Sequence, residues 1–119
     1  MEEFYKQLKS FLKELIQVFP DDQEIKIIST NINLSMIEKD NKIIVKFYKG
    51  LLPLEDLVLS KNDDFFKINP VDYWRNGSQE LKLFTKLIYY WNEVSDNNKT
   101  VIWDYLNLIY IISKKINTF

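Results

Sequence analysis

The chain contains neither histidine nor cysteine among its 119 residues. Histidine is the most common general base, and the two residue types together supply the usual ligands of zinc, haem iron and iron–sulfur clusters. Without cysteine there is also no thiol nucleophile and no disulfide, which fits a reducing compartment. Only oxygen ligands such as carboxylates are left to bind a metal ion.

Glycine and proline are scarce, with 2 and 3 residues respectively. Because an all-β fold needs many turns, this scarcity favours helices. The isolated Gly50 and Gly77 cannot form a phosphate loop or a dinucleotide fingerprint, which require glycine-rich runs. The sequence also lacks an apolar run of about 18 residues, so we expect no contact with a membrane.

The remaining composition is that of a globular protein: 46% hydrophobic, 15% aromatic and 28% charged residues. A chain of this length predicts a single domain over residues 1–119. The net charge of -1 lacks the basic excess that is typical of DNA-binding domains.

Apolar residues recur every three or four positions, which predicts an all-α bundle of five or six helices. The expected helices are residues 3–18, a segment from a cap at Asp21 or Asp22 to Asp40, and residues 42–49, 53–59, 79–94 and 97–116. We expect Gly50 to close the third helix in a left-handed conformation, and residues 67–78 to be irregular. β-Branched residues also suit strands, so the sequence leaves open whether residues 25–48 are wholly helical.

The last helix is apolar on every side between Val101 and Ile112. Such a helix is either buried or part of an interface. We expect the last two helices to form an antiparallel hairpin at the core of the bundle. The alternative is a homodimer whose face includes Tyr105, Ile109 and Ile112.

Carboxylates cluster at Asp21-Asp22-Glu24, Glu55-Asp56 and Asp63-Asp64. None of these groups has the spacing of a calcium loop, and turns or helix caps account for the first and the last. Nothing in the sequence brings two acids together as a catalytic pair. We therefore expect a protein that is not an enzyme and that holds no cofactor and no metal ion.

The aromatic residues of the irregular segment are the strongest candidates for a binding site. Tyr73, Trp74 and Arg75 lie between two turn signals, with Phe65 and Phe66 behind them. Tryptophan and arginine are enriched in binding hot spots, and loops carry binding residues more often than regular elements do. Two alternatives remain: Trp74 covers the core as a lid, or it stacks on a nucleic-acid base.

Four groups of aromatic, acidic and proline residues follow one another along the chain in a characteristic order. They are Phe19-Pro20-Asp21-Asp22, Phe47 with Pro53, Asp63-Asp64-Phe65-Phe66, and Trp91 with Ile102-Trp103-Asp104-Tyr105-Leu106. Over roughly residues 4–112 the chain resembles small uncharacterised helical proteins of the nucleocytoplasmic large DNA viruses, the mimivirus-like giant viruses and their relatives. The resemblance implies an intracellular viral protein, in the host cytoplasm or the virion, and implies no activity and no site residues.

The sequence thus predicts a non-enzymatic protein-interaction module with a viral or host protein as partner. It would serve as a virus-encoded adaptor, an assembly factor or a small virion component. The alternative is a nucleic-acid-associated protein of viral transcription or packaging. In that case Lys6, Lys9 and Lys13, which share one helix, would contact phosphates.

Overall fold

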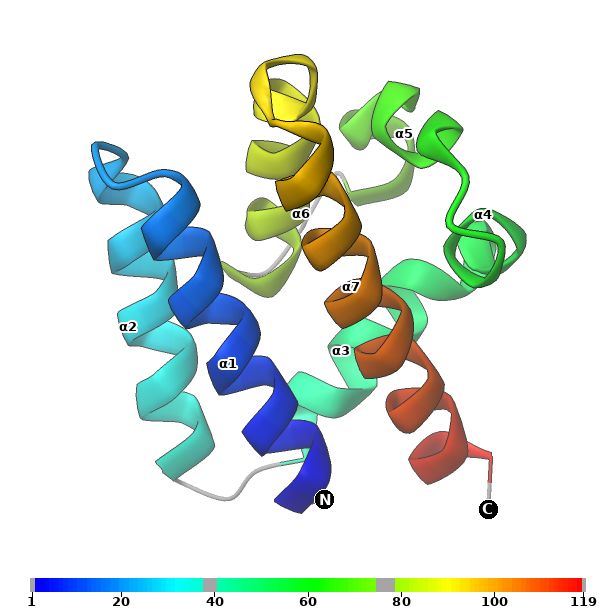
Figure 1. Cartoon of the computed structure of the whole chain (residues 1–119). Helices are drawn as coiled ribbons and strands as arrows, with labels where there is room; N and C mark the ends of the chain where they lie inside the picture. Colours follow the sequence, from blue (N-terminus) through cyan, green and yellow to red (C-terminus); the bar gives the residue numbers. More distant parts are fainter. Residues whose placement is uncertain (1, 38–40, 75–78, 119) are drawn as a thin grey trace.

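The computed structural model describes residues 2–37, 41–74 and 79–118, with the backbone alone for residues 79 and 80. Every regular element in these ranges is a helix (Figure 1). The elements are α1 (Glu2–Val18), α2 (Gln23–Ile37), α3 (Lys42–Leu51), η1 (Leu52–Leu54), α4 (Glu55–Leu59), η2 (Asp63–Lys67), α5 (Pro70–Trp74), α6 (Gln79–Tyr90), η3 (Trp91–Glu93) and α7 (Asp96–Asn117), where η marks a 3-10 turn. The predicted all-α fold is confirmed, and within residues 25–48, which the sequence left open, the described stretches 25–37 and 42–48 are helical.

Local sequence signals determine where the long helices begin and end. Helix α1 stops at Val18, just before Pro20, whose preceding residue is disfavoured in a helix. The backbone N–H of Ile25 donates to the Asp22 carboxylate at 3.0 Å, so Asp22 caps α2. The side chain of Ser95 caps α7 in the same way.

The long helices pack in pairs around a common core. Helices α1 and α2 lie side by side, and α3 crosses the opposite end of the molecule from the α1–α2 turn (Figure 1). Helix α7 packs mainly on α1 and α3, while α6 packs on α2 and α3. The predicted C-terminal hairpin is present, because η3 joins α6 to an α7 that runs in the opposite direction. Helices α6 and α7 nonetheless pack more extensively on α2, α3 and α1 than on each other.

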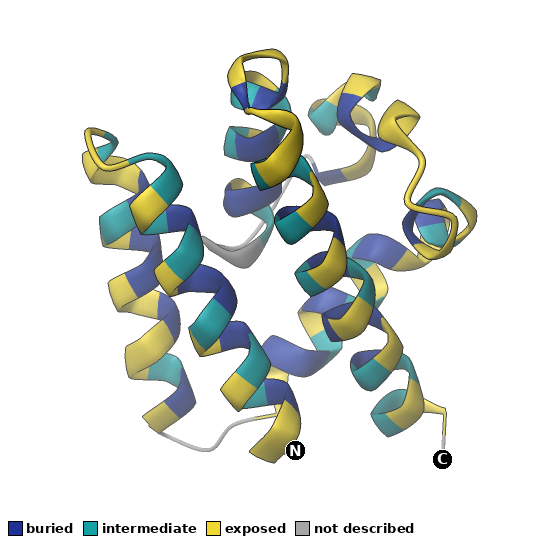
Figure 2. Cartoon of the chain, viewed as in Figure 1, coloured by how far each residue is buried: buried dark blue, intermediate teal, exposed yellow. Residues whose placement is uncertain are grey.

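The core is rich in aromatic side chains. The side chains of five phenylalanines are fully buried: Phe4, Phe11, Phe47, Phe65 and Phe84. Edge-to-face ring contacts join Phe4 to Phe47, Phe47 to Phe84, and Phe84 to Phe65, and Phe65 meets Trp103 in the same way. The radius of gyration is 13.3 Å, close to the roughly 13.5 Å expected for a compact chain of this length. Buried residues line the inner sides of the helices (Figure 2).

Gly50 does not adopt the predicted left-handed conformation. It lies inside α3, and its φ is not positive. A Cβ atom at this position would lie only 2.5 Å from Cδ2 of Leu81. The glycine therefore leaves room for the side chain of Leu81 from α6 against α3, a role that its cap-like place in the sequence does not reveal.

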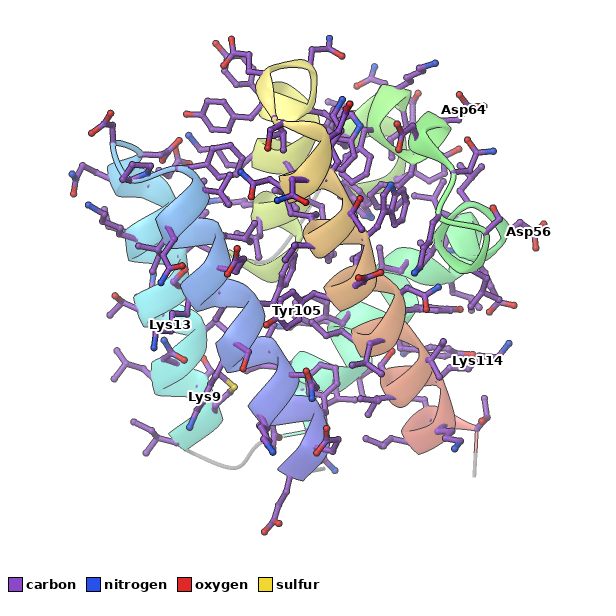
Figure 3. The ribbon with its side chains drawn as sticks, in the orientation of Figure 1. Lys9, Lys13, Asp56, Asp64, Tyr105 and Lys114 are labelled. Atoms are coloured by element: carbon purple, nitrogen blue, oxygen red, sulfur yellow. The ribbon has the colours of Figure 1, made fainter. Side chains whose placement is uncertain are left out.

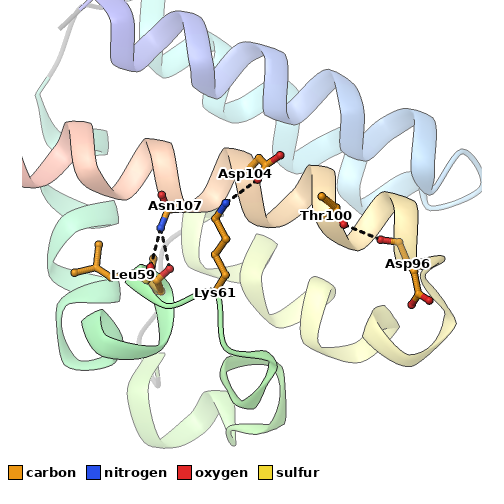
Figure 4. Close-up of polar contacts among 7 residues, drawn as sticks. Leu59, Lys61, Asp96, Thr100, Asp104 and Asn107 are labelled. Atoms are coloured by element: carbon orange, nitrogen blue, oxygen red, sulfur yellow. Dashed lines mark hydrogen bonds and ion pairs between the residues drawn. The ribbon is translucent and has the colours of Figure 1, made fainter.

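The segment that we expected to be irregular contains the short helix α5. Pro70 occupies its first position, where a proline loses no hydrogen bond, and the Asn69 side chain accepts the N–H of Val71 at 3.2 Å. The expected helix over residues 53–59 is divided into η1 and α4. Asn107 of α7 holds the end of α4 by donating to the carbonyls of Val58 and Leu59, at 3.1 and 3.4 Å (Figure 4).

Candidate functional site

The structure places most of the predicted aromatic patch inside the protein. Phe65, Phe66 and Trp74 are 0%, 5% and 7% exposed. The Phe66 ring stacks on Trp91 with centroids 3.6 Å apart, and the Trp74 indole N–H donates to the carbonyl of Gly50 at 2.9 Å. Trp74 thus covers the core, as the lid alternative proposed. These three side chains are not on the surface for a partner to reach.

Tyr73 is the one member of that patch with an exposed side chain in the described ranges, at 45%. Arg75 lies outside the described residues. The structure therefore does not bring the five predicted residues together as one surface, and a binding role for Tyr73 and Arg75 stays a prediction.

The predicted dimer face on α7 is largely covered by the protein's own helices. Ile109 is fully buried, and Tyr105 and Ile112 are partly buried against the core. Tyr105 lies between α7 and α1, where its ring is 5.6 Å from that of Phe11 (Figure 3). This arrangement agrees with the alternative in which the apolar last helix is part of the core.

The side of α2 that faces away from the core carries the exposed apolar residues that the sequence analysis missed. The inner side buries Ile25, Ile28, Ile32 and Met36. On the other side Ile27, Leu34 and Ile37 are 59%, 57% and 73% exposed. Thr30 is also exposed and lies between them at helical spacing. We call Ile27, Thr30, Leu34 and Ile37 the outward seam; exposed residues run along this side of α2 in Figure 2.

The outward seam is also uncharged. From residue 27 to residue 37 the sequence has no Asp, Glu, Lys or Arg, and the exposed positions beside the seam include Asn31 and Asn33. A solvated helix face normally carries charged residues. The sequence does contain a signal for this surface, because apolar residues lie on both the buried and the exposed side of α2. The two sides of the helix therefore differ little in polarity.

The most strongly perturbed carboxylate is Asp22, at the start of α2. Its side chain is 6% exposed and accepts hydrogen bonds from Tyr90, from the backbone of Ile25 and from Lys86, the last at 3.0 Å. Burial by itself would raise the pKa of Asp22, but these donors outweigh it and lower the pKa to about 2.

The two partners of Asp22 are shifted in the opposite direction. Burial lowers the pKa of Lys86, but its hydrogen bonds to Asp22 and Glu24 outweigh that effect and raise it. The hydrogen bond to Asp22 raises the pKa of Tyr90. All three groups are therefore held in their ordinary protonation states, whereas an acid–base catalyst needs a pKa near the working pH. We interpret this cluster as a clamp between α2 and α6.

A second clamp has the same design. Glu55 of α4 accepts hydrogen bonds from Tyr110 and from Lys114 of α7, the latter at 3.0 Å. The hydrogen bond from Tyr110, followed by that from Lys114, lowers the pKa of Glu55. Both clamps join elements that are far apart in the sequence, which is a structural role.

A hollow of about 460 Å³ lies where the α1–α2 turn meets the joint between α6 and α7. The stacked rings of Phe19 and Tyr90, 4.8 Å apart, form part of its wall, and Asp21 and Glu93 stand exposed at its edge. Its buried carboxylate, Asp22, is already bound by the clamp. Across the described ranges there is no group of three or more acidic residues placed to hold a metal ion.

No protein-family model, curated protein or solved structure in the comparisons matches the chain. None of the helices in the described ranges combines the length and the apolar composition that crossing a bilayer requires.

Proposed function

We propose that the chain is a non-enzymatic protein-interaction module that contacts its partner through the outward seam of α2. The observation that carries this proposal is the exposure of Ile27, Leu34 and Ile37, at 59%, 57% and 73%, on one uncharged helix face. Apolar surface in water is unfavourable, and grouped apolar side chains on a helix face are typical of interfaces.

Two further observations support a binding role over a catalytic one. The pKa shifts of Asp22, Lys86 and Tyr90 all lead away from neutrality, so none of these groups is prepared to exchange a proton. The buried aromatic side chains of the predicted patch serve the core. On the outward seam, by contrast, Ile27, Leu34 and Ile37 are each more than half exposed.

The wider biological setting is a proposal that rests on the resemblance alone. We propose an intracellular viral protein that acts as an adaptor, an assembly factor or a small virion component, with a viral or host protein as its partner. The function of the outward seam is independent of this setting, because it depends on the surface chemistry of α2.

A photo-crosslinking residue at position 34, in cells that express the protein, tests the seam. We expect a defined covalent adduct whose yield falls when Ile27→Asp is added to the same chain, because a carboxylate beside the probe opposes apolar contact. The matched control places the probe at Ile111 of α7, a residue that is 40% exposed. Equal adducts from positions 34 and 111 would show ordinary collision and refute the proposal.

One specific observation favours a second candidate function, nucleic-acid binding. Lys6, Lys9 and Lys13 are exposed on one face of α1 (Lys9 and Lys13 are labelled in Figure 3). Contacts between these lysines and phosphates would release counterions, so binding would weaken steeply as salt increases. A titration of duplex DNA at rising salt tests this role. Undetectable binding at low salt, or affinity independent of salt, would exclude it.

A further inference from the structure

We draw no further inference here: the strongest candidate, the hollow of about 460 Å³ between the α1–α2 turn and the α6–α7 joint, rests on the acidic cluster of Asp21 and Glu93 alone, since its buried carboxylate Asp22 belongs to the clamp and no second feature of the described residues points to a ligand.

Discussion

Replacing Asp22 by asparagine tests the clamp between α2 and α6 with little change of shape. The substitution removes the negative charge, while the amide oxygen can still accept the N–H of Ile25 that caps α2. It weakens the charge-assisted hydrogen bonds from Tyr90 and Lys86. Because the side chain of Asp22 is only 6% exposed, water cannot fully replace these interactions.

The magnitude follows from the pKa of Asp22. The fall from 3.8 to about 2 corresponds to about 2 kcal/mol of stability, at ~1.4 kcal/mol for each pKa unit. Since the pKa is lower in the folded protein, this stability is fully present above pH 4. It is lost as the pH falls through about 2, when the carboxylate is protonated. We therefore expect wild type to exceed Asp22→Asn by about 2 kcal/mol at neutral pH and the gap to close mostly between pH 4 and pH 2.

Urea unfolding at a series of pH values measures this gap. Trp74, Trp91 and Trp103 are all buried, so tryptophan fluorescence reports loss of the core. Asp21→Asn is the matched control, because it removes the same charge from an exposed neighbour. We expect this control to stay within about 0.5 kcal/mol of wild type at every pH. A gap for Asp22→Asn that is constant from pH 5 to pH 2, or an equal pH dependence in the control, would refute the clamp.

Four further stability predictions use the same unfolding measurement. Phe65→Ala should cost about 3–5 kcal/mol, whereas Tyr73→Ala should cost under about 1 kcal/mol, because Phe65 is in the core and Tyr73 is on the surface; similar losses would contradict this assignment. Trp74→Phe should cost about 1 kcal/mol, since it removes the indole donor to α3. Glu55→Gln should cost about 1–2 kcal/mol above pH 5, and less in acid because the pKa of Glu55 is lowered in the folded protein. Leu34→Lys should change stability by less than about 0.5 kcal/mol; a larger loss would make the outward seam part of the core.

The helices could be predicted from the sequence because their signals are local. The stripe of Phe4, Leu8, Phe11, Leu12 and Leu15 has helical spacing and is buried as expected. The cap predicted at Asp21 or Asp22 is likewise observed, at Asp22. Such signals operate within one or two turns of chain, so a single sequence contains them in full.

The sequence left open whether Trp74 covers the core or contacts a partner, because the choice depends on contacts that are distant in the sequence. Before it, the turn signal at Asn69-Pro70 coincides with the start of the short helix α5. The side chain of Trp74, however, is directed inward by the carbonyl of Gly50 and by the ring of Phe65. Asp22 and Lys86 are likewise 64 positions apart. No local pattern relates such residues.

The outward seam differs, because its signal is local but α2 carries a second, buried apolar stripe that explains the helix by itself. Ile25, Ile28, Ile32 and Met36 account for the buried side of α2. Ile27 and Leu34 were then left without a role, although they are seven positions apart and thus on one face. Apolar residues on two opposite faces of one helix are therefore the local pattern that indicates such a surface.

Helix α1 supplies an internal comparison for α2. Both helices bury one apolar stripe and lie side by side, so folding requires one apolar side of each helix. On the exposed side α1 carries Lys6, Lys9 and Lys13, whereas α2 carries Ile27 and Leu34. The charged outer face of α1 shows that folding does not require apolar residues there, and in water they favour aggregation. We therefore attribute the apolar residues of the outward seam to contact with a partner, because folding of the single chain does not require them.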